Sequence, residues 1–159
     1  MAKLKHIAIA SQDPKKTAEF YRSVFGLKQV GNVEGHNAEG VYLTDGDISI
    51  AILKFKNETL AGLDYGVEYS GLHHIGFQVD DLSDADARLQ AAEVEPSSDI
   101  NSVRRSEMGE GHGGRNVALN YAGPDGVLID VSQIGWVGAG AKKAGKNGTH
   151  PTNGASPGK

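Results

Sequence analysis

The sequence has no cysteine, one tryptophan and no excess of positive charge. Without cysteine, a disulfide framework and a thiolate metal site are both excluded, so any metal ion must be held by histidine, aspartate, glutamate or backbone oxygen. No stretch approaches the roughly 18 consecutive apolar residues that a membrane-spanning helix needs. A net charge of −4 also gives no basic surface for nucleic acid. These absences favour a soluble protein that does not bind nucleic acid.

The chain of 159 residues is long enough to bury one core of ordinary size. The apolar run near Met1 is too short for a secretory signal peptide, and we therefore expect a cytoplasmic protein. Residues 137–159 are rich in glycine and lysine and have no large apolar side chain after Val137. They predict a flexible tail that follows a single domain of residues 1–136.

Two stretches of the sequence resemble each other. Residues 4–13 read LKHIAIASQD and residues 71–81 read GLHHIGFQVDD. Each is a short apolar strand with a histidine near its start, followed by acidic or turn residues and a helical pattern. His6 and His74 are equivalent and lie 68 residues apart, 74 minus 6, which suits a duplicated half-domain.

The pattern of apolar and turn residues predicts an α+β fold with two β-α-β-β-β modules. Module one covers residues 1–56, a polar linker covers 57–70, and module two covers 71–136. The helix of module one begins with Asp13 and Pro14 and ends before Gly26. Strands are expected at 3–10, 27–33, 40–43, 47–55, 72–79, 115–121 and 127–134, helices at 14–25 and 83–92, and a mobile loop at 102–114.

The two equivalent histidines are candidate metal ligands. Side chains alternate along a strand, so His6 shares a face with Ala8, and His74 shares one with Gly76. The small neighbours predict space beside each imidazole. A lone histidine is usually structural, but two at matching positions favour a ligand pair. His73 is expected to face the packing side, as a structural residue or a support for His74.

Asp130 is the candidate third ligand. A carboxylate in the middle of an apolar strand is costly to bury unless it is paired or bound to metal. The alternative is a salt bridge to Arg115 or Arg104. Counted from the two Asp-Gly turns, the equivalent residue of module one is Ile50, which has no donor atom. Two histidines and one carboxylate with an open side are typical of non-haem Fe(II) or another first-row divalent ion.

Four segments of the chain resemble the vicinal oxygen chelate superfamily. They are KHIAIA, FYRSVFGLK, HHIGFQVDDL and GPDGVLIDVS, spread over residues 3 to about 135. The resemblance implies paired βαβββ modules that form a cup-shaped mixed sheet around a divalent metal ion. It assigns the ligands to His6, His74 and Asp130, with aspartate in place of the usual glutamate. The resemblance also implies a homodimer, as in many members of the superfamily.

Members of that superfamily differ in activity, and they include glyoxalase I, methylmalonyl-CoA epimerase, extradiol dioxygenases, and resistance and binding proteins. Glyoxalase I and the epimerases use a fourth ligand, Glu or Gln, where this chain has Ile50. His112 and Tyr121 resemble the histidine and tyrosine of the ring-cleaving signature, because 121 minus 112 and 130 minus 121 are both 9. Tyr121 would form a hydrogen bond with the substrate, and His112 would act as a general acid or base.

The main functional prediction is therefore an extradiol-type dioxygenase that acts on a small substrate with two neighbouring oxygens. Fe(II) is the favoured ion, and Mn, Ni, Co or Zn are the other candidates. One alternative is a glyoxalase I-like lyase or isomerase, or an epimerase. The other is a small-molecule binding or resistance protein. The ion would act as a Lewis acid on the two substrate oxygens in each enzymatic case.

Overall fold

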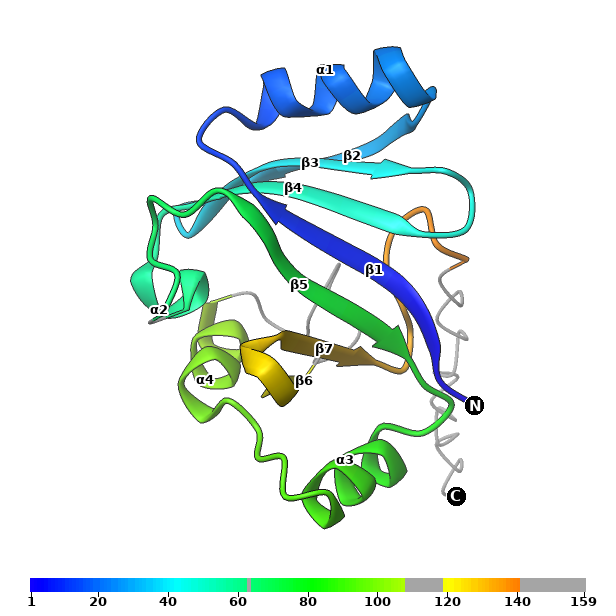
Figure 1. Cartoon of the computed structure of the whole chain (residues 1–159), viewed down its shortest axis with the longest axis vertical. Coiled ribbons are helices and arrows are strands. Elements are labelled where there is room, and N and C mark those ends of the chain that lie inside the picture. Colours follow the sequence, from blue (N-terminus) through cyan, green and yellow to red (C-terminus); the bar gives the residue numbers. More distant parts are fainter. Residues whose placement is uncertain (63, 108–118, 141–159) are drawn as a thin grey trace, which may run out of the picture.

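One mixed sheet runs through the chain, with strand order β2-β3-β4-β1-β5-β7-β6 (Figure 1). The computed structural model describes residues 1–62, 64–107 and 119–140. The strands are β1 (Lys3–Ala10), β2 (Lys28–Glu34), β3 (Ala38–Thr44), β4 (Ser49–Phe55), β5 (Gly71–Gln78), β6 (Leu119–Ala122) and β7 (Leu128–Ser132). The helices are α1 (Pro14–Phe25), α2 (Glu58–Ala61), α3 (Leu82–Ala91) and α4 (Ser98–Glu107), with a 3₁₀ turn at Pro124–Gly126.

The two modules meet at the centre of the sheet. β1 and β5 pair antiparallel there, and each also pairs in parallel with the last strand of its own module, β1 with β4 and β5 with β7. This arrangement confirms the predicted α+β class and the duplication. Among the described residues of module two, an isolated bridge from Pro96 to Tyr121 extends the sheet beyond β6.

Helix α1 covers the outer face of module one (Figure 1). Its first turn is capped by Asp13, which accepts a hydrogen bond from the Lys16 amide at 3.0 Å. Gly26 ends the helix with a φ of 72°, a backbone conformation that suits glycine. Ala18 packs against the buried Val41, Leu43 and Ile52. No helix in the described part of the chain is long and apolar enough to cross a membrane.

The opposite, inner face of the sheet carries the candidate ligands. In the β1–β4 register His6 pairs with Ser49, whereas Ile7 pairs with Ile50. Ile50 packs with the α1 cluster, so His6 and its alternate neighbours point the other way. His6 and Ala8 are fully buried, while Ile7 is only half-buried. The face predicted to hold open space is therefore the more deeply buried one.

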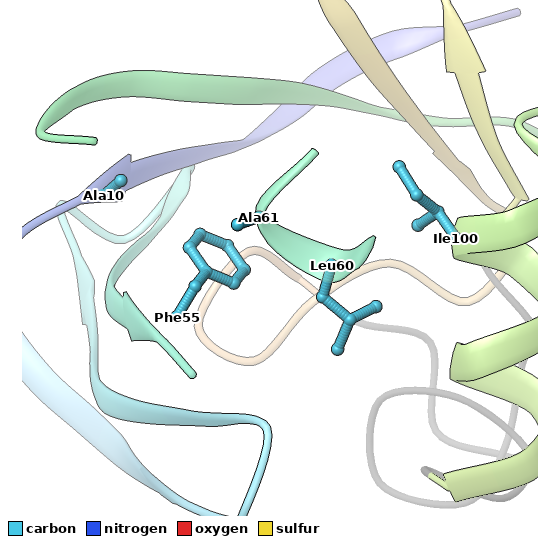
Figure 2. Close-up of a cluster of buried hydrophobic side chains, with 5 residues drawn as sticks. All are labelled: Ala10, Phe55, Leu60, Ala61 and Ile100. Atoms are coloured by element: carbon cyan, nitrogen blue, oxygen red, sulfur yellow. The ribbon is translucent and has the colours of Figure 1, made fainter. Parts of the chain in front are cut away.

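The predicted linker and loop both contain helices that build the core. Helix α2 lies within residues 57–70, and helix α4 covers the first part of the predicted loop 102–114. Figure 2 shows side chains from β1, β4, α2 and α4 gathered in one buried cluster, which consists of Ala10, Phe55, Leu60, Ala61 and Ile100. Leu60 of α2 and Ile100 of α4 are buried in this cluster, although the surrounding sequence is polar.

The packed chain extends beyond the predicted domain boundary at residue 136. Trp136 and Ala139 are each 1% exposed. The Thr44 hydroxyl donates a hydrogen bond to the Gly138 carbonyl at 2.7 Å, which ties this segment to the end of β3. Residues 137–140 are therefore part of the folded domain, and the remainder of the predicted tail, 141–159, lies outside the described residues.

Candidate metal centre

Three side chains from three adjacent strands meet on the inner face. One ligand atom each from His6 on β1, His74 on β5 and Asp130 on β7 lie within 4.8 Å of one another. His74 Nε2 is 3.3 Å from Asp130 Oδ2. The registers explain the convergence, because Gly76 of β5 pairs with His6 on one side and with Asp130 on the other.

The donor set fits a divalent metal ion. Two imidazoles and one carboxylate, without thiolate, suit a first-row transition ion. Ligand atoms about 2.0–2.2 Å from one ion lie at most about 4.4 Å apart. Three ligands arranged tetrahedrally around one ion lie roughly 3.4 Å apart, so side-chain rotations that shorten the separations by up to about 1.4 Å would bring all three atoms to one ion. His6, His74 and Asp130 are 1%, 3% and 0% exposed, so these residues would shield a bound ion from bulk water.

Trp136 fills the space beside the His6 imidazole. The two rings stack with centroids 4.8 Å apart and planes 2° apart. A Cβ on Gly76 would lie 2.7 Å from His6 Cβ and 2.8 Å from the Trp136 ring, so only glycine fits there. The predicted open space thus holds an indole that fixes the imidazole plane. The single tryptophan of the chain lies at the end of the predicted domain, and no local sequence pattern indicates its contact with His6.

A pair of buried asparagines holds Asp130. Asn120, opposite Asp130 in the β6–β7 hairpin, donates from Nδ2 to Asp130 Oδ1 at 2.7 Å. The backbone N–H of Asn120 donates to Asn101 Oδ1 at 2.8 Å, and Asn101 Nδ2 donates to the backbone carbonyl of Asn120 at 3.1 Å. Oδ1 of the carboxylate is thereby engaged, and Oδ2 points to His74. Sequence reasoning missed both asparagines, although hairpin counting from Asp130 leads to Asn120.

His73 contacts the ligand beside it. Its Nδ1 is 2.8 Å from His74 Nδ1, and its Nε2 is 2.7 Å from the Ala61 carbonyl oxygen. The β1–β5 register shifts where Ala8 pairs with His74 and Ile9 with Leu72, which makes His73 the extra residue of a bulge. The bulge breaks the strict alternation, so the expectation that His73 faces away from the site is wrong.

The residue of module one that corresponds to Asp130 is Ala51, not Ile50. Gly76 pairs with Asp130 in module two, and its equivalent Ala8 pairs with Ala51 in module one. Ile50 faces helix α1. The count from the Asp-Gly turns was wrong by one residue, because the equivalent pairing occurs one residue later after Gly46 than after Gly126. Ala51 has no donor atom either, so the open side of the site remains.

Tyr121 lies on the other face of the sheet. It pairs with Ile129 rather than Asp130, is fully buried, and packs with Val79 and Val131 beneath α3. Its hydroxyl donates a hydrogen bond to Asp86 Oδ1 at 2.7 Å. Burial and this carboxylate raise the pKa of Tyr121 well above its usual range. The structure therefore does not bring Tyr121 to the candidate metal site, and its hydroxyl serves as a hydrogen-bond donor to Asp86 on the far face.

Three residues with predicted roles have side chains that the structure does not describe. His112 and Arg115 lie in the segment 108–118, outside the described residues, and so does the side chain of Arg104. The proposed role of His112 stays a prediction. In the described part of the chain, Asp130 contacts Asn120 and His74.

Comparisons with known proteins agree with this architecture. The model of the Glyoxalase/Bleomycin resistance protein/Dioxygenase superfamily matches residues 3–131. The mitochondrial methylmalonyl-CoA epimerase of Mus musculus is 26% identical over 137 residues, which are 84% of this chain and 74% of that protein. Among solved structures, a methylmalonyl-CoA epimerase in complex with methylmalonyl-CoA and NH4+ has a TM-score of 0.63 at 21% identity, covering 83% of this chain and 94% of the other.

A variant of the Streptomyces coelicolor methylmalonyl-CoA epimerase, in complex with 2-nitronate-propionyl-CoA, has a TM-score of 0.60 at 22% identity and covers 82% of this chain and 92% of its own. These structures share the fold. The relatives favour the epimerase alternative over the dioxygenase prediction. Because the relative from mouse is a mitochondrial protein, the cytoplasmic location stays a prediction. The match over residues 3–131 shows that this chain belongs to the Glyoxalase/Bleomycin resistance protein/Dioxygenase superfamily.

Proposed function

We propose that this chain is a divalent-metal-dependent isomerase of the epimerase type, acting on a small acyl thioester such as methylmalonyl-CoA. The observation that carries the proposal is the meeting of His6, His74 and Asp130 within 4.8 Å on the buried inner face. The sequence similarity to methylmalonyl-CoA epimerases gives the reaction type. When bound, the ion would supply Lewis-acid stabilisation of charge on two neighbouring substrate oxygens.

The residues of the chain itself have distinct tasks in this proposal. His6, His74 and Asp130 would hold the ion and leave coordination positions open for the substrate, as in other catalytic metal sites. Trp136 fixes the plane of His6, and Asn120 fixes one oxygen of Asp130. The residue at the fourth position is Ala51, so the substrate oxygens would approach from the side of module one.

The proton transfer requires an acid–base group. His112 remains our proposal for it, because an imidazole exchanges protons near neutral pH. Tyr121 takes no part, since its hydroxyl is committed to Asp86 on the far face. An isomerase consumes no O₂, so the reaction does not require Fe(II). We therefore propose a first-row divalent ion and leave Fe, Mn, Co, Ni and Zn as alternatives to be distinguished by assay.

The test is deuterium exchange at the substrate α-carbon. Methylmalonyl-CoA is incubated in D₂O with protein loaded with Co(II), and loss of the α-proton signal is followed by NMR. We expect exchange that depends on the metal, is lost in His74→Ala and is retained in the matched far-face variant Tyr121→Phe. Absence of exchange with methylmalonyl-CoA and with related acyl thioesters, in protein shown to hold metal, would refute the proposed reaction.

A second assay addresses the ring-cleaving dioxygenase, whose two-histidine, one-carboxylate donor set this site shares. Protein loaded anaerobically with Fe(II) is mixed with a panel of catechols, and oxygen uptake is recorded. The proposal predicts no uptake above that of His74→Ala. Uptake that depends on His74 would favour the dioxygenase instead.

A further inference from the structure

The histidine that precedes the candidate metal ligand of β5 lies within hydrogen-bond distance of it. We propose that His73 is a positioning residue that holds His74 as its Nδ1–H tautomer, so that the Nε2 lone pair is directed at the ion. The proposal rests on the metal site proposed above and adds a residue that does not itself touch the ion.

The Ala61 carbonyl determines which ring nitrogens of His73 and His74 carry a hydrogen. The Ala61 carbonyl can only accept, so His73 Nε2, 2.7 Å away, must carry a hydrogen. A neutral imidazole with that hydrogen has a lone pair on Nδ1. His73 Nδ1 and His74 Nδ1 are 2.8 Å apart, which requires one hydrogen between them. His74 Nδ1 therefore donates it, and His74 Nε2 is left with a lone pair.

The second nitrogen of His74 then faces a carboxylate. His74 Nε2 is 3.3 Å from Asp130 Oδ2, and in this tautomer both atoms are acceptors. Two acceptors that face each other repel unless a cation lies between them. The opposite tautomer would place an N–H at this point, directed at Asp130, and would block the nitrogen from a metal ion. The hydrogen bond to His73 thus selects the form of His74 that binds metal.

His73 is itself held rigidly enough to impose this choice. It is 3% exposed, and its ring lies 4.4 Å from Phe55 and 5.2 Å from Tyr65, centroid to centroid. Ala61 is the last residue of α2, where carbonyls have no partner within the helix and can accept from a side chain. Figure 2 shows Ala61 and Phe55 in the same buried cluster. The core beneath α2 therefore fixes the ligand through His73.

Nuclear magnetic resonance tests the tautomer without any metal or substrate. Metal-free protein with ¹⁵N-labelled histidine is measured above the pKa of free imidazole, and the His74 signals are assigned by their loss in His74→Ala. We expect the Nδ1–H form in the wild type and a shift toward the Nε2–H form in His73→Phe, which keeps a ring but removes both hydrogen bonds. A wild-type His74 in the Nε2–H form would overturn the proposal.

Metal affinity gives the second readout, by competition of Co(II) with a chelator. Loss of a partner that orients a ligand lowers affinity by about 10- to 100-fold, and we expect this for His73→Phe. In His73→Asn, the amide oxygen can still accept from His74 Nδ1–H, so part of the affinity should return. The matched control is Tyr121→Phe, which removes a buried hydrogen bond on the far face of the sheet and leaves both hydrogen bonds of His73 in place. It should lower the unfolding midpoint but leave the affinity within about twofold of wild type.

The outcomes separate this inference from the proposed function. A folded His73→Phe with wild-type affinity overturns the role of His73 while the metal site stands. A wild-type protein that binds no metal refutes the site, yet the tautomer measurement still decides what His73 does to His74. If His73→Phe fails to fold, the wild-type tautomer and the affinity of His73→Asn decide, and an affinity of His73→Asn equal to that of His74→Ala would contradict the proposal.

Discussion

The two modules share a plan but divide the site unequally. Module one contributes His6 alone, and the inner face of its last strand presents Ala51 where module two presents Asp130. Module two contributes two candidate ligands and the residues that contact them, Asn120 and His73. The duplication thus places four equivalent positions around one point, and three of them carry a side chain that could bind a metal ion. The side left open belongs to module one, and that is where a substrate would complete the coordination.

On the outer face of the sheet, module one is more tightly packed than module two. Helix α1 of module one buries Ala18 in a tight cluster, whereas α3 of module two has no buried residue. A cavity of about 440 Å³ lies between α3 and the sheet, lined by Phe77, Val79 and Leu89 among others. Module two is therefore the more loosely packed half, although it carries most of the site. A bound ion would stabilise this half by binding only the folded state.

The largest expected effect comes from removing a ligand of module two without changing its shape. Asp130→Asn retains the volume of the side chain but replaces a charged ligand by a neutral amide. We expect Co(II) affinity to fall by at least about a thousandfold, which corresponds to roughly 4 kcal/mol. A competition titration measures it, with Asp86→Asn on the far face as control. Equal affinity in Asp130→Asn and wild type would show that the carboxylate is not a ligand.

The asymmetry between the modules can be tested by filling the empty position. Ala51→Glu adds a carboxylate at the residue equivalent to Asp130, and Ala51→Gln adds the same volume without charge. Overpacking should destabilise both variants by about 1–3 kcal/mol. The charge should make Ala51→Glu bind Co(II) at least about tenfold more tightly than Ala51→Gln. Identical affinities in the pair would place Ala51 away from the ion and break the equivalence.

The contact between the modules at Gly76 has a smaller expected effect. Gly76→Ala would bring a methyl group to 2.7 Å from His6 Cβ and 2.8 Å from the Trp136 ring. We expect a loss of about 1–3 kcal/mol in the free energy of unfolding, measured by urea denaturation. Gly126→Ala is the control for a glycine with no neighbour near its Cβ, although its φ of 73° also strains alanine. A stability unchanged in Gly76→Ala would contradict the tight packing of the indole.

The smallest effect is expected on the outer face of module two. Tyr121→Phe removes the hydrogen bond to Asp86 and should cost about 0.5–1.5 kcal/mol of unfolding free energy, with metal affinity unchanged. Because the pKa of Tyr121 is raised in the folded state, its contribution is complete below the unfolded value near 10 and declines as pH rises above it. Urea denaturation at neutral and alkaline pH measures this. A gap between wild type and Tyr121→Phe that widens at alkaline pH would contradict the assignment.

Sequence reasoning selected three side chains that the fold brings together, because the duplication is visible in the strands that carry them. The paired histidines and the one acid in a mid-strand apolar setting, Asp130, were sufficient to predict the convergence that the structure shows. Helix α1 was predicted with its correct bounds, since Asp13, Pro14 and Gly26 mark both ends by local backbone chemistry.

The parts that were missed depend on geometry that composition does not encode. A one-residue difference between turns moved the equivalent of Asp130 from Ala51 to Ile50, and a bulge turned His73 toward His74. The stacking of Trp136 on His6 is a contact between residues 130 positions apart, 136 minus 6, which no local pattern reveals. Tyr121 was assigned by spacing to a signature, whereas its pairing with Ile129 places it on the far face.

The central claim is that one divalent ion is held jointly by both halves of the sheet. Elemental analysis of protein purified without added metal or chelator tests it most directly, with His6→Ala and His74→Ala purified in parallel. The account predicts about one divalent ion per wild-type chain, as a single site of three ligands would hold, and little or none in either variant. Metal content that is the same in all three proteins would contradict it.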